Sequence, residues 1–131
     1  MAVKDSNIIE LTVVSLGKPV SANAYRNWHW GRRAAYTKKW RAESARMLNQ
    51  SGAANEPLTC ATVTVTPTQK NRSAIADVAA CYPAAKAVID GAVDANVLPD
   101  DTPEHVTAVT FLPAQITGTD GLKILIEGEL L

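Results

Sequence analysis

The stretch DVAACYPAAKAVIDGAVDANVLPDD, from Asp77 to Asp101, has the clearest helical pattern in the chain and five of its thirteen acidic residues. Apolar residues recur in it at spacings of three and four, as on the buried face of a helix. They are Ala85, Val88, Ile89, Ala92 and Val93. We expect a helix from about Pro83 to Ala95, because proline suits a first helical turn and would break a helix that began at Asp77.

The polar residues of this stretch fall on the opposite face of the predicted helix. Lys86, Asp90 and Asp94 are four residues apart and therefore share that face. Asp77 precedes the helix, and the pair Asp100–Asp101 follows it after a short exit. Because such a helix is roughly 20 Å long, the carboxylates at its two ends can meet only if the flanking loops fold back. Solvated charges on a surface helix are the alternative interpretation.

A second helix and two strands are expected before this stretch. The β-branched run Ile8–Val14 predicts a strand. The alternation in Leu58–Thr66 predicts another, with Ala61, Val63 and Val65 on one face. Thr37 is the expected N-cap of a helix that ends near Gln50, before Ser51 and Gly52. One stripe of that helix carries Trp40, Ser44, Met47 and Leu48.

Two more strands are expected after the acidic stretch. Val106–Leu112 and Leu122–Glu127 are interpreted as a strand pair joined by the turn-rich segment Pro113–Gly121. Pro67–Ala76 is a polar connection between the Leu58–Thr66 strand and Asp77. The resulting order β-α-β-α-β-β predicts an α/β (α+β) fold, a single domain over residues 1–131 with two helices packed against a mixed sheet.

Composition points to one globular domain. The chain has 131 residues, of which 47% are hydrophobic, and ordinary amounts of glycine and proline. No apolar run approaches the ~20 residues needed to span a bilayer, and the N-terminus lacks the apolar core of a signal peptide. Cys60 and Cys81 lack the spacing of a zinc site, so we expect them to be reduced, buried apolar residues. We therefore expect a cytoplasmic protein.

Charge is distributed unevenly although the net charge is zero. The segment Lys18–Arg46 contains eight basic residues and one acidic residue, Glu43, whereas the chain from Ala74 onward contains nine acidic residues and two lysines. A basic surface could bind phosphates, and an acidic one could bind cations. The alternative is that the two halves of the fold simply attract each other.

The basic segment also carries aromatic residues and amides. Between Ser21 and Arg33, arginines alternate with Tyr25, Trp28 and Trp30, a composition that suits gripping a sugar-phosphate backbone and stacking on exposed bases. Alternatively, the tryptophans anchor this segment to the core or to a second subunit. His29 is interpreted as a structural residue. The candidate DNA-binding residues of the chain are Asn23, Arg26, Arg32, Arg33, Lys38, Lys39, Lys70 and Arg72.

The motif KAVIDGAVDANVLPDDTPEHV, from Lys86, resembles the RusA family of Holliday-junction resolvases. The segment PVSANAYRNWHWGRRAAYTKKWR, from Pro19, resembles the family's Asn-rich, basic N-terminal half, so that the resemblance extends over roughly Leu11 to Phe111. It implies a small homodimeric endonuclease of the kind common in phages and prophages. Such an enzyme would resolve branched DNA in recombination and repair with Mg²⁺, or alternatively Mn²⁺, as its cofactor.

The resemblance also implies a set of site residues. The implied catalytic residues are Asp77, Lys86, Asp100 and Asp101, and the three aspartates among them are the implied metal ligands. Asp90 is a candidate supporting residue, whose spacing predicts an ion pair with Lys86. Phosphodiester hydrolysis needs a deprotonated water and stabilisation of the negative charge on phosphorus, and Mg²⁺ held by carboxylates supplies both. A nearby lysine can stabilise the transition state.

One departure from the family pattern leaves alternatives open. The family loop reads Asp-x-Asp-Asn, whereas this chain has Asp77-Val-Ala-Ala80. Counted back from Lys86, the two family aspartates fall at Ala80 and Tyr82, so Asp77 is a shifted stand-in. A second hypothesis is therefore a branched-DNA-binding module that does not cleave. A third is a protein-interaction domain, which would show no salt-dependent DNA affinity.

Overall fold

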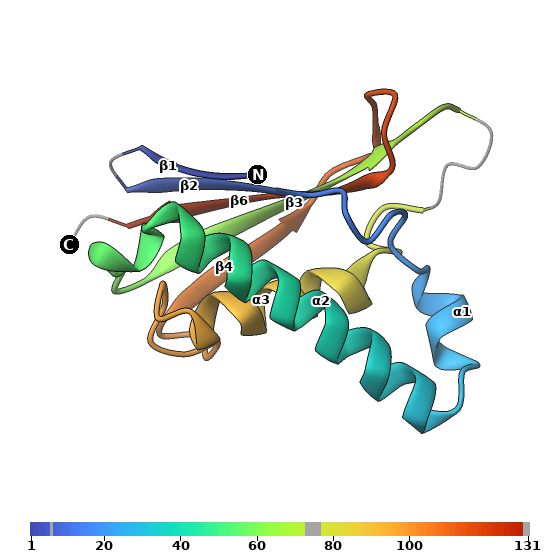
Figure 1. Cartoon of the computed structure of the whole chain (residues 1–131), viewed down its shortest axis with the longest axis horizontal. Helices are drawn as coiled ribbons and strands as arrows, with labels where there is room; N and C mark the ends of the chain where they lie inside the picture. Colours follow the sequence, from blue (N-terminus) through green and yellow to red (C-terminus); the bar gives the residue numbers. More distant parts are fainter. Residues whose placement is uncertain (6, 73–76, 130–131) are drawn as a thin grey trace.

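The computed structural model, which describes residues 1–5, 7–72 and 77–129, is one mixed α+β domain. Its strands are β1 (Ala2–Asp5), β2 (Ile8–Val13), β3 (Ala61–Gln69), β4 (Val106–Phe111), β5 (Gln115–Ile116) and β6 (Gly121–Gly128). Its helices are α1 (Ala22–Arg26), α2 (Trp30–Ser51), the 3-10 turn η1 (Ala53–Asn55) and α3 (Tyr82–Asp94). The predicted fold class is confirmed. Figure 1 shows α2 and α3 together on one face of the sheet.

The sheet runs in the order β1-β2-β6-β3-β4, and β5 pairs with the end of β3. The predicted strand pair at the C-terminal end is wrong in its pairing. β4 lies parallel to β3, whereas β6 lies antiparallel between β2 and β3, so β3 separates β4 from β6. The physical reason is that α3 serves as the crossover that parallel neighbours require, and β4 therefore joins the sheet beside β3.

The core lies between the sheet and the two long helices. The predicted inward face of β3 is confirmed, because Ala61, Val63 and Val65 are fully buried while Thr62 and Thr64 are half-buried. The strand begins three residues after the predicted Leu58 and extends three residues beyond the predicted Thr66, so Pro67 lies in β3 rather than in the connection. Residues 73–76 of the expected connection Pro67–Ala76 lie outside the described residues.

The helix predicted from Pro83 to Ala95 is α3, and both of its bounds are within one residue of the prediction. Pro83 lies in its first turn, where no intrahelical hydrogen bond is lost. Its apolar face is buried as expected, except that Val93 is only partly buried. Both cysteines are buried as expected, and Cys81 is the residue that precedes α3.

The predicted start of the other helix is wrong, because α2 begins at Trp30 rather than after Thr37. His29 caps the helix, since its imidazole Nδ1 accepts a hydrogen bond from the backbone N–H of Gly31 at 3.1 Å. The Thr37 hydroxyl instead lies 3.0 Å from the Tyr25 hydroxyl. At the other end, Gly52 adopts the left-handed conformation typical of a helix C-terminus, near the predicted end.

An aromatic cluster fixes the additional turns of α2 to α1. The ring centroid of Tyr36 lies 5.4 Å from that of Trp28 and 6.0 Å from those of Tyr25 and Trp40. The Tyr36 hydroxyl accepts a hydrogen bond from the backbone N–H of Val20 at 2.9 Å, and burial raises the pKa of Tyr36 to about 12. The cluster therefore connects the buried Trp40 to α1.

Among the helices of the described ranges, none combines the length and the apolar character required to cross a membrane.

Candidate functional site

The centre of the candidate site is the side chain of Lys86 on α3. Its ammonium group donates hydrogen bonds to Asp90 Oδ1, at 2.8 Å, and to Asp101 Oδ2. The first bond is the predicted ion pair four residues along the helix. The second joins α3 to the segment that follows it, so this segment folds back over the helix. Two carboxylates from separate elements therefore converge on one cation.

Lys86 and Asp101 shift each other's pKa. Partial burial lowers the pKa of Lys86, but its hydrogen bonds to Asp101 and Asp90 outweigh this effect, so the pKa is raised. The hydrogen bond from Lys86, together with the interaction with Asp100, lowers the pKa of Asp101. Asp100 itself accepts a hydrogen bond from the backbone N–H of Asp101 at 2.7 Å. At neutral pH Lys86 is therefore protonated and Asp101 is ionised.

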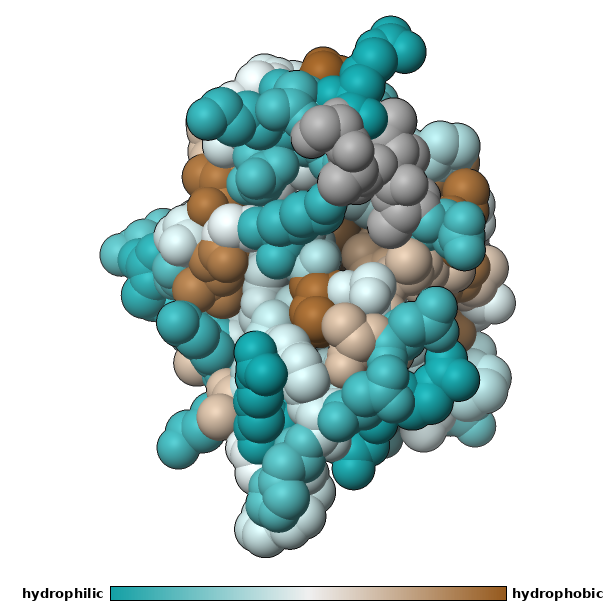
Figure 2. All heavy atoms as spheres, turned by 90° about the vertical axis from the view of Figure 1, so that its right-hand side faces the viewer, coloured by the Kyte–Doolittle hydropathy of each residue, from teal (hydrophilic) through white to brown (hydrophobic). Residues whose placement is uncertain are grey.

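Two cavities open beside Lys86, and Lys86 and Tyr82 line both of them. The larger, of about 330 Å³, lies between α1, α2 and the start of α3. It is lined by Ala22, Tyr25, Arg26, Arg33, Thr37, Tyr82, Pro83 and Lys86. We call it the basic cleft. Figure 2 views the molecule from the side of α1, and hydrophilic side chains (teal) cover much of the lower half of this surface.

The smaller cavity, of about 150 Å³, lies between α3 and β4. Apart from Lys86 and Asp101, the residues that line it are apolar or aromatic: Tyr82, Ala85, Ile89, Val106, Val109 and Phe111. The ring centroid of Tyr82 lies 6.3 Å from that of Phe111. Asp101 thus has a low-polarity surface on one side, and Lys86 separates it from the basic cleft.

The structure brings some of the predicted DNA-binding residues to the site. Arg26 and Arg33 line the basic cleft together with Lys86. Asn23 accepts a hydrogen bond from Arg26 at 2.8 Å, which holds the guanidinium group in place. The guanidinium carbon of Arg32 lies 3.8 Å from the ring centroid of Trp28.

The other predicted DNA-binding residues do not line the basic cleft. Lys38 and Lys39 are exposed on α2, while Lys70 and Arg72 are exposed just after β3. Sequence reasoning did not name Tyr25, Thr37 or Tyr82 as site residues, although Tyr25 belongs to the segment expected to grip DNA. For Tyr82 there were two hints: it takes the position of a family aspartate, and it lies four residues before Lys86, one helical turn away.

One ion pair joins the basic and the acidic halves of the chain. Arg41 on α2 donates to both carboxylate oxygens of Asp94 on α3, at 2.5 and 2.7 Å. This interaction raises the pKa of Arg41 and lowers that of Asp94. Among the residues that the structure describes, Arg26 and Arg33 form no ion pair. Attraction between the basic and acidic halves of the chain thus explains the ion pair of Arg41. It does not engage Arg26 and Arg33, which can therefore bind other anions.

Asp77 is the predicted site residue that the structure does not join to the others. It is exposed at the start of a turn, in which the backbone N–H of Ala80 donates to its carbonyl at 3.0 Å. Its carboxylate forms no hydrogen bond or ion pair with any described residue. The backbone N–H of Ala22 donates to the Ala80 carbonyl at 2.7 Å, so this turn contacts the start of α1.

The donors that are present fit a hydrated Mg²⁺ but not a fully protein-coordinated ion. Within the described ranges, no three His, Cys, Asp or Glu side chains form a group suited to a metal. Asp90 and Asp101 do converge, since both accept from the same Lys86 ammonium group, and Asp100 adjoins Asp101. Mg²⁺ commonly uses only one or two carboxylates and completes its shell with water and substrate phosphate. Asp101, with Asp90 or Asp100, therefore meets that requirement without Asp77.

Comparison with known proteins assigns no family to the chain. No protein-family model matches it, and no curated protein shows a significant sequence match. A function must therefore be inferred from the residues and their arrangement.

Proposed function

We propose that the chain is a metal-dependent endonuclease that acts on branched DNA such as Holliday junctions, in the manner of the RusA family that its sequence resembles. The observation that carries this proposal is that Lys86 belongs at once to the Asp90–Asp101 carboxylate cluster and to the cleft that Arg26 and Arg33 line. A DNA phosphate bound by the two arginines would lie next to the lysine and the carboxylates. A nuclease requires this combination of anion binding and carboxylates.

Each residue has a distinct role in this proposal. Arg26 and Arg33 bind and orient the DNA backbone through charge-assisted hydrogen bonds. Lys86 stabilises the negative charge that develops on the phosphate. Asp101, with Asp90 or Asp100, would hold Mg²⁺, which would supply Lewis acidity and a more acidic water. Asp77 would contribute only after a movement of its turn, since it is not part of the cluster.

We further propose that the active form is a cytoplasmic homodimer. A four-way junction contains pairs of equivalent strands, and two copies of the chain related by a two-fold axis would present two equivalent sites to them. This part of the proposal rests on the symmetry of the substrate and on the family resemblance. A cross-linking or sedimentation measurement of the DNA-free and the DNA-bound protein would test it.

Cleavage of a labelled four-way junction is the direct test. The wild type, Asp101→Asn and Lys86→Ala would be compared with and without Mg²⁺, beside a linear duplex of matched sequence. Glu104→Gln is the matched control, because Glu104 is an exposed carboxylate three residues after Asp101 that forms no ion pair with a described residue. We expect metal-dependent nicking of the junction by the wild type and the control, and at least a 100-fold loss in the two site variants, on the order that a transition-state charge stabiliser supplies.

A non-cleaving DNA-binding module is the second candidate. The position of Asp77 outside the cluster, with Ala80 and Tyr82 where the family has aspartates, favours it. Junction binding that persists without metal, together with no nicking under any metal condition, would establish this candidate. Absence of binding to both junction and duplex at low salt would contradict both candidates.

A further inference from the structure

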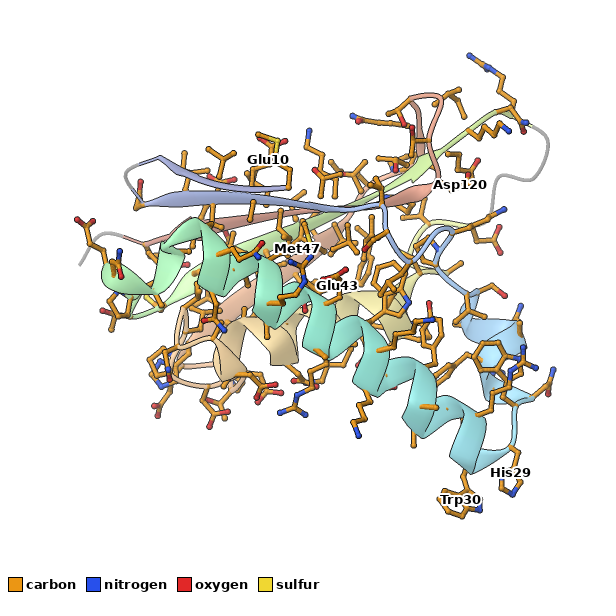
Figure 3. The ribbon with its side chains drawn as sticks, viewed as in Figure 1. Glu10, His29, Trp30, Glu43, Met47 and Asp120 are labelled. Carbon is orange, nitrogen blue, oxygen red and sulfur yellow. The ribbon has the colours of Figure 1, made fainter. Side chains whose placement is uncertain are left out.

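Trp30, the first residue of α2, is the most exposed aromatic side chain at the projecting end of the molecule. Its side chain is 70% exposed, and it is the only large hydrophobic residue exposed on α1 or α2. Figure 3 shows Trp30 and His29 at the far tip of α2, pointing away from the sheet. An exposed tryptophan at a tip is energetically unfavourable in water, because its large apolar surface remains hydrated.

Trp28, only two residues earlier, is in a different situation. Its ring lies edge-on to Tyr36 with 5.4 Å between the centroids, and it also contacts Tyr25 at 6.0 Å. Arg32 covers the ring at 3.8 Å. Trp28 therefore anchors α1 to α2, and its ring is already in contact with Tyr25, Tyr36 and Arg32. Among the described residues, the one aromatic ring that packs on Trp30 is that of His29, with 5.3 Å between the centroids.

The chain segment that carries Trp30 is strongly basic. No acidic residue occurs between Glu10 and Glu43, a stretch that includes all of α1 and the first half of α2. Arg26, Arg32 and Arg33 lie on these two helices, and none of them forms an ion pair with a described residue. Trp30 therefore sits in a positive region with no carboxylate of its own segment to oppose an anion.

We propose that Trp30 is a stacking platform for an unpaired DNA base, held there by a backbone that the arginines of α1 and α2 bind. Every nucleic-acid base has an aromatic face that a tryptophan can stack on, and the adjacent phosphates match the basic surroundings. The ligand class is single-stranded or unpaired nucleotides next to a branch point. This inference rests on the proposed DNA function and adds the part of the substrate that the tip of α2 binds.

A protein or membrane partner fits the same surface less well. Protein interfaces and membrane-inserting surfaces both need a contiguous apolar area, to which several side chains contribute. Among the described residues of α1 and α2, Trp30 is the only large exposed apolar side chain. One ring within a basic surface is the arrangement typical of binding to a base and its phosphates.

The test separates stacking from backbone binding. Binding to a 12-nucleotide oligothymidylate and to an abasic oligomer of the same length would be measured by fluorescence anisotropy, without metal, for the wild type, Trp30→Ala, Trp30→Phe and Arg33→Gln. The abasic oligomer keeps the phosphates and lacks the bases. Circular dichroism would check that each variant is folded, which we expect because the Trp30 side chain is mostly exposed.

We expect the wild type to prefer the thymidylate by about 5- to 150-fold, the range that stacking of one base supplies. Trp30→Ala should lose this preference while keeping its affinity for the abasic oligomer, and Trp30→Phe should keep most of the preference. Arg33→Gln should weaken binding of both oligomers alike. These results would support the platform.

Three results would overturn it. The first is that Trp30→Ala keeps the wild-type preference for the thymidylate over the abasic oligomer. The second is that the wild type itself shows no such preference, even though it binds DNA or cleaves junctions. Both results would leave the proposed function intact. The third is a blue shift of tryptophan emission with anionic phosphatidylserine vesicles but no binding of either oligomer. That result would assign the tip to membranes, whereas the DNA function is tested separately by binding and cleavage of the junction.

Discussion

Gly91 on α3 packs directly against Ser44 on α2, so that a Cβ atom added to Gly91 would lie 2.2 Å from Ser44 Oγ and 2.6 Å from the Arg41 carbonyl oxygen. The two helices cross at this point with only backbone and a small side chain between them. We expect Gly91→Ala to lower the free energy of unfolding by about 1–3 kcal/mol, as overpacking does, despite the better helix propensity of alanine. Urea denaturation would measure this change.

Gly31→Ala is the matched control for this prediction. Its added Cβ would meet only the imidazole ring of His29, 3.3 Å from Nδ1 and 3.6 Å from Cε1, rather than backbone. The free energy of unfolding should therefore change less than in Gly91→Ala. An equal loss in the two variants would show that the crossing of α2 and α3 tolerates a methyl group.

The Arg41–Asp94 pair makes stability depend on acidic pH. The hydrogen bond from Arg41 holds the folded-state pKa of Asp94 below its ordinary value of 3.8. The contribution of the pair is therefore complete above that value and is lost as the pH falls through the lower, folded-state pKa. Because both side chains are partly exposed, we expect only about 0.2–1 kcal/mol.

Unfolding free energies between pH 7 and pH 2 would check this prediction. Asp94→Asn should be less stable than the wild type at pH 7, and the difference should shrink as the pH falls from 3.8 towards 2. Arg41→Gln should give the same profile, and the double variant should show no further loss. Additive losses in the double variant would mean that the two residues act independently.

Lys86 should control the ionisation of Asp101. Its hydrogen bond is the main cause of the lowered pKa of the Asp101 carboxyl group. In Lys86→Ala that pKa should move back up towards its ordinary value, with Asp100 as the remaining influence. Carbon-detected NMR titration of the aspartate side chains would measure it. Lys123→Ala is the control, because Lys123 lies 3.5 Å from Glu10 on the sheet and should leave Asp101 unchanged.

DNA affinity should distinguish the arginines of the cleft from Arg41. Arg33 lines the basic cleft without an ion-pair partner among the described residues, whereas Arg41 is bound to Asp94. We expect Arg33→Gln to reduce the slope of log affinity against log salt by about 1, the value for one lost phosphate contact. Arg41→Gln should reduce it much less. Equal slopes for the wild type and Arg33→Gln would remove the basic cleft from the DNA-binding surface.

Local pattern was enough to predict the elements whose burial follows a simple period. α3 has an apolar stripe and a proline at its start, so it was predicted nearly in full. β3 alternates between valine and threonine, so its central residues and its buried face were predicted, although both of its ends lie three residues later. The Lys86–Asp90 pair likewise follows from a spacing of four along one helix. These features depend on neighbours in sequence, which a single chain reveals.

The features that depend on distant contacts were not predicted. The first turns of α2 exist because His29 caps them and because Trp28 and Tyr36 pack across to α1. Neither interaction has a recognisable sequence period. The position of β6 between β2 and β3 is a matter of topology, and the contact between Lys86 and Asp101 requires a fold-back after α3. Asp77 was grouped with that cluster from the family resemblance, whereas its exposed carboxylate forms no ion pair or hydrogen bond with a described residue.

Because α2 is uninterrupted, it would fix the distance between Trp30 and the basic cleft in the proposed enzyme. Trp30 precedes Thr37, a residue of the basic cleft, by seven positions on a single helix, which corresponds to about 10 Å along the axis. A stiff helix cannot stretch to suit the substrate. An unpaired base held on Trp30 would therefore stay at a fixed distance from the basic cleft in junctions, flaps and forks alike.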